Sequence, residues 1–350
     1  MTSKLIFGQG INTEKKVTFK NCKIREGISK NTDAKENSFL IFSKDSLYTL
    51  GDGDGELDYK ENKSLKQIHW GQLKLLMSEI QALVYYGDTS NFSEIVYVGA
   101  APGEHLYVLA QMFPQFNYHL YDKQDFDNRL EKLKNITIYK KYFEQEDIET
   151  WKKSKKKIFF ISDIRSLNYQ VKNKNKAEQI INQNMDQQQF WFEQIKPYVG
   201  LFKFKLPYAT SYNSGKKSTK NYLDGIIFRQ VFAKKNSSET RLLVKGLGYR
   251  EWNLERYEKK VSYHNNIVRE KNTYKNPIDL SNNPVYREKG FMNDYDSVCS
   301  AMILKDYLQK VNAVGNISNV RSLIDYIIDN ICIKKENKLI IKNSFDDDDD

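Results

Sequence analysis

The chain has 350 residues, 40% of them hydrophobic and 13% aromatic, which is enough to bury a sizeable core without crosslinks. The sequence contains no run of about 18 apolar residues, which argues against a membrane span. The three widely spaced cysteines argue against a zinc site or a disulfide framework. The net charge of +10 fits a polyanionic partner, but it fits equally a basic protein from an AT-rich genome.

Residues 1–64 form an N-terminal extension that we expect to be partly irregular. It has few periodic segments and no long apolar stretch typical of a secretory signal, so we expect a reducing, cytosolic setting. The acidic stretch "GDGDGELDY" (51–59) lacks the spacing of a calcium loop and predicts a turn-rich connector.

Residues 65–335 are predicted to form the main domain, beginning with an amphipathic helix. In 69–86, apolar residues recur at helical spacing and indicate one buried stripe. Lys74 falls on the flank of that stripe, where a long side chain can reach past the apolar surface.

Strands then alternate with helices. We predict strands at 95–99, 118–122, within 135–143, at 158–164 and at 201–207, with helices at 104–113 and within 177–196. Further strand-like segments lie at 226–232 and 240–246, and helical segments at about 252–272 and 294–333. This rhythm predicts an α/β, Rossmann-like fold: a doubly wound, mostly parallel sheet with helices on both faces. The tail 336–350 ends in five aspartates and is expected to be disordered, because like charges repel.

Two lysine-rich runs are candidates for contact with a polyanion. They are "WKKSKKK" (151–157) and "SGKKSTK" (214–220), and each is also a plausible solvated loop.

The turn "VGAAPG" between the first strand and its helix predicts a ligand site. Gly99 and Gly103 bracket it with a spacing that excludes a Walker loop and fits a dinucleotide fingerprint poorly. A nucleoside without phosphates, such as S-adenosylmethionine, remains, and Asp122 at the end of the second strand can accept its ribose hydroxyls. The glycine pair alone can be purely structural; with Asp122 and the strand rhythm it favours a methyltransferase.

Four charged residues near strand ends suit methyl transfer to a ribose hydroxyl. A desolvated lysine beside another cation has a lowered pKa and can take or orient the hydroxyl proton, without any metal. Alternatively, the lysines face water from an edge strand and the glutamate only flanks the sheet. The candidate set is Lys74, Asp163, Lys203 and Glu239.

Six segments resemble a known family when taken together and in order. They are "HWGQLKLLMSEI", "VYVGAAPGEH", "ISDIRS", "FKFKLPY", "SETRLL" and "RYEKKVSYHNNIVR". Over residues 56–310 the chain resembles the poxvirus cap-specific mRNA 2′-O-methyltransferases, which are also small regulatory subunits of poly(A) polymerase.

This resemblance implies roles for individual residues. The Lys-Asp-Lys-Glu set becomes catalytic, with Lys203 as the central base-like residue. The implied S-adenosylmethionine pocket consists of Gln72, Tyr97, Gly99, Gly103, His105, Asp122, Phe143 and Asp163, with Gln124 where the family has an arginine. As alternatives, His105 simply caps its helix and Tyr97 packs in the core.

The resemblance also implies a pocket for the methylated guanine of the cap. Tyr59 and Tyr208 match two rings that clamp the cationic base, which stacks more strongly than a neutral one. Glu258 matches one carboxylate that reads the base, while the second carboxylate position is Thr210. The resemblance further implies that the RNA is contacted by Lys205, Ser237, Ser238 and Glu239.

The implied activity is methylation of the 2′-hydroxyl of the first transcribed nucleotide, which converts cap 0 into cap 1. The implied partners are capped mRNA and a poly(A) polymerase catalytic subunit, in the host cytoplasm or a virion and without a membrane. One alternative is a non-catalytic RNA-binding processivity subunit, which can coexist with the enzyme. A remoter one is ribose methylation of ribosomal or transfer RNA, against which Tyr59 and Tyr208 argue.

Overall fold

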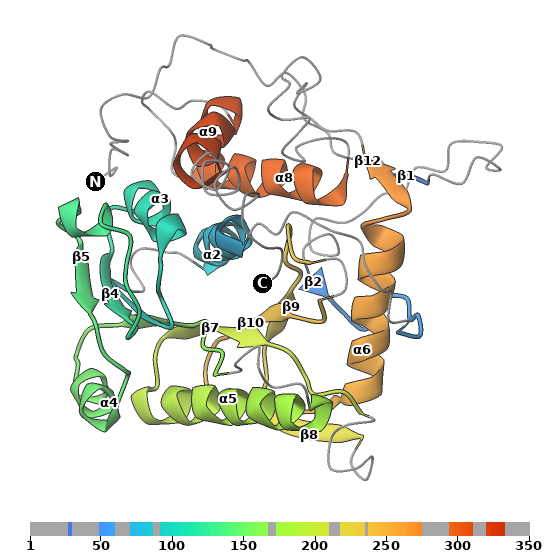
Figure 1. The fold of residues 1–350 in the computed structure, drawn as a ribbon, viewed down its shortest axis with the longest axis horizontal. Coiled ribbons are helices and arrows are strands. Elements are labelled where there is room, and N and C mark those ends of the chain that lie inside the picture. The colour runs from blue at the N-terminus through green and yellow to red at the C-terminus, as the bar shows by residue number, and fades with distance from the viewer. Residues whose placement is uncertain are drawn as a thin grey trace.

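A computed structural model of the chain describes residues 27–29, 49–59, 71–86, 92–166, 173–209, 218–234, 237–274, 294–310 and 320–332. Its centre is an eight-stranded sheet with the order β2-β9-β10-β7-β6-β3-β4-β5 (Figure 1). The strands are β2 (Thr49–Leu50), β3 (Glu94–Val98), β4 (Asn117–Tyr121), β5 (Ile136–Tyr139), β6 (Ile158–Ser162), β7 (Val199–Phe204), β9 (Ile226–Phe228) and β10 (Thr240–Val244).

The sheet has a parallel part and an antiparallel part. Strands β3 to β7 pair in parallel, as the alternation of strands and helices predicts. Strands β10, β9 and β2 extend the sheet antiparallel from β7, because no crossover helix separates β9 from β10. The predicted α/β doubly wound fold is confirmed, and its last strands reverse direction.

Helices cover both faces of this sheet (Figure 1). One face carries α2 (Gly71–Tyr86), α3 (Glu104–Met112), α8 (Tyr295–Lys310) and α9 (Val320–Ile327). The other carries α4 (Gln145–Lys152) and α5 (Lys174–Ile195). Alternate residues of β3 join the two cores: Ile95 and Tyr97 lie in the first, Val96 and Val98 in the second. This explains why β3 reads as an uninterrupted apolar run.

Several predicted boundaries were wrong. The helical segment 252–272 divides into β11 (Tyr249–Asn253), α6 (Leu254–Tyr263) and the π-helix η3 (His264–Val268), followed by β12 (Asn272–Tyr274). The segment 294–333 contains two described helices, α8 and α9, and the π-helix η4 (Ile328–Cys332). Asn253 accounts for the first division, since its side chain accepts the Arg256 N–H and begins α6.

Several short elements were missed, among them a helix and two strands. Helix α4 begins with a capping box between Glu144 and Asp147, a signal that the sequence does contain. Strand β8 (Thr219–Leu223) pairs with β11 in a separate two-stranded sheet, and β1 (Gly27–Ser29) pairs with β12 in another. The lysine run 214–220 therefore ends inside β8.

The proposed division at residues 64 and 335 stays a prediction, since residues 1–26, 30–48, 60–70 and 333–350 lie outside the described part. Within the described ranges, every helix is too short or too polar to cross a membrane.

Candidate functional site

The two central parallel strands, β3 and β6, end side by side where the chain changes direction across the sheet. From β3 the chain proceeds to β4 and β5, and it returns to place β6 on the other side of β3. Such a switch point is where open α/β sheets bind ligands, beyond the carboxyl ends of the strands. The glycine turn and Asp163 both lie at this point.

Gly99 is required by the protein backbone itself. Its φ is +80°, and a Cβ there would come within 3.0 Å of the Asp163 carbonyl carbon and the Ile164 nitrogen. Gly103 has φ +70° and begins α3, where a Cβ would lie 3.0 Å from the Ala100 carbonyl oxygen. Both positions therefore require glycine for the fold itself, and the absence of side chains there lets the turn lie tight against the end of β6.

Asp122 is tied to this turn. Its carboxylate accepts the Ala101 N–H at 3.2 Å and the N–H of the exposed Gln124 at 2.9 Å. The Gly99 N–H donates to the Tyr121 carbonyl at 2.9 Å, which fixes the end of β4 beside the turn. A carboxylate oxygen has lone pairs left after one such bond, so Asp122 can still accept hydroxyl groups of a ligand.

A buried polar network lies beneath the turn, between α2, β3 and α3. Gln72 Oε1 accepts from the His105 N–H at 3.2 Å and lies 2.7 Å from His105 Nδ1. His105 Nε2 lies 3.2 Å from Glu79 Oε1, which also accepts the Tyr97 hydroxyl at 2.7 Å. His105 does not cap α3, because Gly103 occupies that position without a side-chain bond. Glu79 joins the network without having been predicted.

Phe143 lies on the opposite face of the sheet. Its ring packs edge-on against Tyr121, Phe160 and Trp191 and is buried in the core under α4 and α5. The structure therefore separates Phe143 from the Gln72–His105 network, and its predicted contact with a ligand stays a prediction.

The four predicted catalytic residues converge from four elements. The Lys203 ammonium, on β7, lies 3.2 Å from Asp163 Oδ1 and 3.8 Å from Glu239 Oε2. The Lys74 ammonium, on α2, lies 2.6 Å from Glu239 Oε1. All four side chains are 11–14% exposed. These residues are separated widely in the chain, and the switch point brings them into contact.

Two arginines complete this cluster and were missed by sequence reasoning. Arg165 Nη2 lies 2.9 Å from Glu239 Oε2, and the fully buried Arg241 pairs with Asp163 Oδ1. Arg241 is also the direct cross-strand neighbour of Lys203 in the β10–β7 pairing. Both arginines lie within the motifs "ISDIRS" and "SETRLL", so the signal was present. Four cations thus face two carboxylates.

The charges and burial shift the pKa values in opposite directions. Burial lowers the pKa of the Lys203 ammonium, and Arg165 and Lys74 lower it further, against the raising effect of Asp163 and Glu239. For Glu239, burial favours the neutral acid, yet the surrounding cations hold its pKa well below the usual value. The cluster therefore combines fixed carboxylates with an ammonium that loses its proton more readily than an exposed lysine.

The alternative of an edge strand with solvated lysines is wrong. Strand β7 lies between β6 and β10, and the side chains of Lys203, within it, and Lys205, just after it, are each only 12% exposed. Burial lowers the pKa of Lys205 as well, although its partner Glu178 raises it.

The predicted cap-binding rings lie next to each other. The Tyr59 and Tyr208 ring centroids are 5.7 Å apart, with planes tilted by 36°. Tyr208 is anchored through its hydroxyl, 3.3 Å from Ser238 Oγ, and Lys205 Nζ lies 4.4 Å from the centre of its ring. The structure thus assembles these predicted residues beside the Lys203 cluster, since Lys205 directly follows the end of β7, two residues after Lys203.

Glu178, on α5, is a further member that the sequence did not suggest. Its carboxylate accepts from Lys205 Nζ at 2.6 Å and from the Tyr208 backbone N–H at 3.1 Å. Burial raises the pKa of Glu258, and the nearby Glu178 carboxylate raises it further. A second carboxylate therefore stands near the rings, supplied by a helix. Thr210, the predicted position for it, lies outside the described residues.

The segment before β10 is held by side chains from α6 and η3. The Tyr257 hydroxyl donates to the Ser238 carbonyl at 2.6 Å, and Asn265 Nδ2 donates to the Ser237 carbonyl at 2.8 Å. Ser237 Oγ accepts the Glu239 N–H at 3.1 Å. These bonds fix Glu239 between the Tyr59 and Tyr208 rings and Lys203.

The lysine run 151–157 lies away from this site. Trp151 is buried and bonds to the Tyr121 hydroxyl, while Lys156 pairs with Glu94 at the start of β3. That is the amino edge of the parallel strands, opposite the edge that carries the cluster. In the other run, Lys220 pairs with Asp186 on α5, and residues 214–217 lie outside the described part.

Known proteins match most of the chain. Residues 41–333 match the family described as poly A polymerase regulatory subunit. The chain is 30% identical over 238 residues to the cap-specific mRNA (nucleoside-2′-O-)-methyltransferase of Myxoma virus (strain Lausanne), which covers 62% of this chain and 68% of that protein. The fowlpox virus (strain NVSL) protein of the same name is 29% identical over 62% and 74% of the two chains. The structure of bluetongue virus VP4, a multifunctional RNA-capping protein, aligns with 60% of this chain and 37% of VP4, at 14% sequence identity. Its TM-score of 0.39 is too low to bear on fold or function.

Proposed function

Because the chain belongs to the poly(A) polymerase regulatory subunit family, we propose that it methylates the 2′-hydroxyl of the first transcribed nucleotide of capped mRNA, with S-adenosylmethionine as donor. Relatives that match it at about 30% identity are named cap-specific mRNA methyltransferases, and cap methylation is the activity they support. The donor and the role of Lys203 are argued from the site geometry, and the first-nucleotide specificity from the resemblance of the sequence motifs.

One observation carries the proposal: the Lys203 ammonium is enclosed by charge at the switch point of the sheet. It lies 3.2 Å from Asp163 and 3.8 Å from Glu239, and Asp163 directly adjoins Gly99 of the glycine turn. A lysine in this place can act on a group held at the mouth of a nucleoside site. An RNA clamp without catalysis has no need of it.

The chemistry assigned to the cluster is activation of an alcohol. S-Adenosylmethionine supplies an electrophilic methyl group on a sulfonium sulfur. Neutral Lys203 accepts the 2′-hydroxyl proton on Nζ and so raises the nucleophilicity of the ribose oxygen. Asp163 and Glu239 hold the ammonium in place after it gains the proton, while Lys74 and Arg165 make the proton easier to lose again.

The donor fits the residues at the turn. Asp122 presents a carboxylate that the Ala101 and Gln124 N–H groups orient, and its remaining lone pairs suit ribose hydroxyls. The positive φ at Gly99 and Gly103 keeps the turn free of side chains. We assign these residues to the nucleoside part of the donor.

The cap is assigned to the ring pair. A cationic 7-methylguanine is attracted to the faces of Tyr59 and Tyr208, and Glu258 and Glu178 add negative charge nearby. The methyl group is thereby sensed as a charge on the base.

The test uses short RNAs with and without a methylated cap, and a donor with a labelled methyl group. We expect label only in capped RNA, at the first ribose, and a loss of about 10² to 10⁴ in rate for Lys203→Ala. Lys134→Ala is the matched control, because Lys134 is exposed at the amino edge of the sheet. Donor binding without methyl transfer in the wild type would overturn the enzyme proposal.

A second role is favoured by the family itself, whose description is that of a poly(A) polymerase regulatory subunit. We propose that the chain also associates with a poly(A) polymerase catalytic subunit. Co-purification of the two purified proteins, unaffected by Lys203→Ala, is the expected result. A dependence on Lys203 would instead tie the association to the catalytic cluster.

A further inference from the structure

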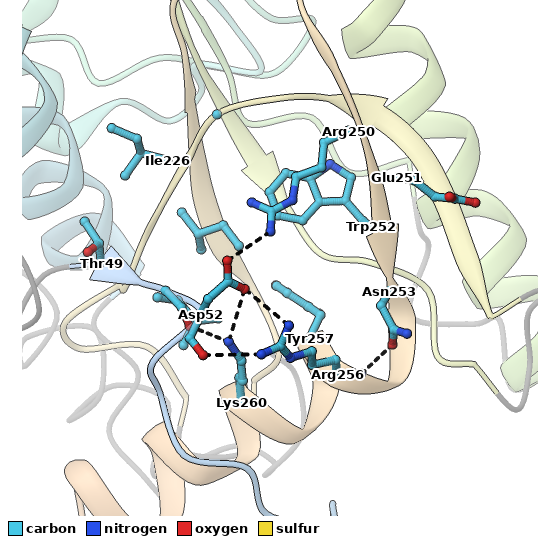
Figure 2. Close-up of a pocket in the computed structure, with 14 residues that line it drawn as sticks. Thr49, Asp52, Ile226, Arg250, Glu251, Trp252, Asn253, Arg256, Tyr257 and Lys260 are labelled. Carbon is cyan, nitrogen blue, oxygen red and sulfur yellow. Dashed lines mark hydrogen bonds and ion pairs between the residues drawn. The ribbon is translucent and has the colours of Figure 1, made fainter.

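Residues 51–58, here called the acidic clasp, lie along helix α6 and end at Tyr59. The clasp carries four carboxylates, each within 4 Å of a cation outside it. Figure 2 shows its first half, where Asp52 points toward three basic side chains. This acidic stretch has no part in the mechanism proposed above.

Basic side chains of β11 and α6 bind the first half of the clasp. Asp52 lies 3.6 Å from Arg250 Nη2, 3.4 Å from Arg256 Nη1 and 3.6 Å from Lys260 Nζ. Arg256 also donates to the Asp52 carbonyl at 3.3 Å, and Lys260 donates to the Gly51 carbonyl (Figure 2). Both backbone and side chain are therefore bound by the same cations.

The second half continues the contact toward Tyr59. Glu56 accepts from Arg256 Nε at 3.1 Å, and Asp58 lies 3.3 Å from Lys259 Nζ. The Leu57 N–H donates to the Lys259 carbonyl at 3.0 Å. Asp54 pairs with the buried Arg229, just beyond β9.

One glycine makes the close contact possible. A Cβ at Gly55 would lie 2.6 Å from the Tyr263 ring at the end of α6, whereas a Cβ at Gly53 would meet nothing within 4 Å. Of these two glycines, only Gly55 is needed for the clasp to lie flat against the helix.

A cavity of about 350 Å³ lies beside the first half. Its wall includes Leu50, Ile227 and Trp252, with the Arg250 guanidinium 4.6 Å from the Trp252 ring. The first half of the clasp thus borders open space, into which a small shift can move it.

Such a shift is what cap binding demands. A base stacked between two rings needs about 7 Å between them, twice the optimal separation of carbon atoms in contact. The Tyr59 and Tyr208 centroids are 5.7 Å apart and tilted. Tyr208 is anchored by Glu178 and Ser238, so Tyr59 is the ring that moves.

We propose that the acidic clasp is a positioning device for cap recognition: its charge pairs with α6 hold Tyr59 facing Tyr208 and allow the small opening that admits the base. This rests on the proposed function, because it gives Asp52, Glu56 and Asp58 their role through Tyr59. In the Glu56–Arg256 and Asp58–Lys259 pairs the side chains are 32–79% exposed, so these two pairs contribute weakly and salt screens them. Lys260 and Arg229, which pair with Asp52 and Asp54, are buried.

The first experiment removes charge from the clasp. In the full chain, Asp52→Asn with Glu56→Gln is expected to raise KM for capped RNA about three- to tenfold, with kcat and the donor Kd unchanged. The same double variant should also show a smaller preference for the methylated over the unmethylated cap. Glu251→Gln is the matched control, since Glu251 lines the same cavity but bonds to Thr219 and not to the clasp.

The second experiment restores the charge pair in reverse. Glu56→Arg and Arg256→Glu should each raise KM for capped RNA, and the two together should recover most of the loss. Gly55→Ala should raise KM as well, while Gly53→Ala should not. Rescue by the reversed pair would show that the Glu56–Arg256 contact, and not either charge alone, sets KM for capped RNA.

Two results would overturn the inference. One is an unchanged KM and cap preference in the double charge-removal variant; the other is tighter binding of capped RNA, which would mean that Asp52 competes with RNA for the same cations. Both leave methyl transfer by the wild type intact. A wild type without transfer would instead remove the proposed function, so the two failures are distinguishable.

Discussion

The Lys203 cluster and the acidic clasp use the same chemistry in opposite surroundings. Both set lysines and arginines against aspartates and glutamates. In the cluster the side chains of Lys203, Asp163 and Glu239 are 12–14% exposed; in the clasp Asp52 is 70% and Asp58 79% exposed. Burial therefore decides whether such pairs alter proton affinity or only hold two segments together.

The difference follows from the dielectric around the charges. In a buried site a charge interacts strongly with its neighbours and is costly to leave alone, so pKa values move and each partner is required. At the surface, water and salt screen the same pairs, and several are needed to position a segment. In the proposed function, the cluster serves the reaction and the clasp serves placement.

The largest contrast is expected in stability. Arg241→Met removes a buried cation that pairs with Asp163 and should lower the free energy of unfolding by about 3 to 5 kcal/mol. Arg256→Met, in the clasp, should lower it by about 1 kcal/mol or less. Urea unfolding of both variants measures this, and equal losses would break the contrast.

The next contrast is in pH dependence. Because Lys203 must be neutral to accept a proton and its pKa lies below the ordinary value, kcat/KM should rise about tenfold per pH unit and level off below pH 10.5. Lys203→Arg should abolish the activity and with it the rise of kcat/KM with pH. The clasp double variant should keep the same profile, since its charges are distant from the reacting group.

The ring pair joins the two regions and gives a smaller effect. Tyr208→Ala should reduce the preference for the methylated cap about tenfold, because one stacking face is lost, while donor affinity stays the same. Competition between methylated and unmethylated capped RNA measures the preference. If it does not change, Tyr208 is not part of the cap site.

Salt should give the smallest effect and only in the clasp. Between about 50 mM and about 500 mM salt, cap preference should fall roughly twofold in the wild type, because screening loosens the exposed pairs. The variant lacking the Asp52 and Glu56 charges should respond less. Comparing preference, rather than affinity, removes the salt dependence of RNA binding itself.

The sequence predicted best what is local or periodic. The buried runs of β3 and β6 and the stripe of α2 follow directly from their apolar spacing, and the glycine turn falls between β3 and α3 as expected. The meeting of Asp163 and Lys203 follows from the parallel strands β6 and β7, which end at one edge. Glu239 reaches them from just before the start of the antiparallel β10, and Lys74 from α2.

What was missed depends on pairing between distant segments. The antiparallel direction of β9 and β10 and the β8–β11 sheet need partners that no local pattern specifies. Glu178 gives no local signal in the sequence, because only the fold brings it against Lys205. The same holds for the clasp, whose acidic residues are loop-like by composition and acquire a partner only through α6.

The antiparallel pairing of β10 with β7 sets Arg241 opposite Lys203, and the connection between these strands passes through Tyr208 and Ser238. Register, rather than the length of that connection, sets the Lys203 ammonium beside Arg241. Insertions or deletions between the strands can therefore change the surface around Tyr208 while the pairing of these two cations is kept.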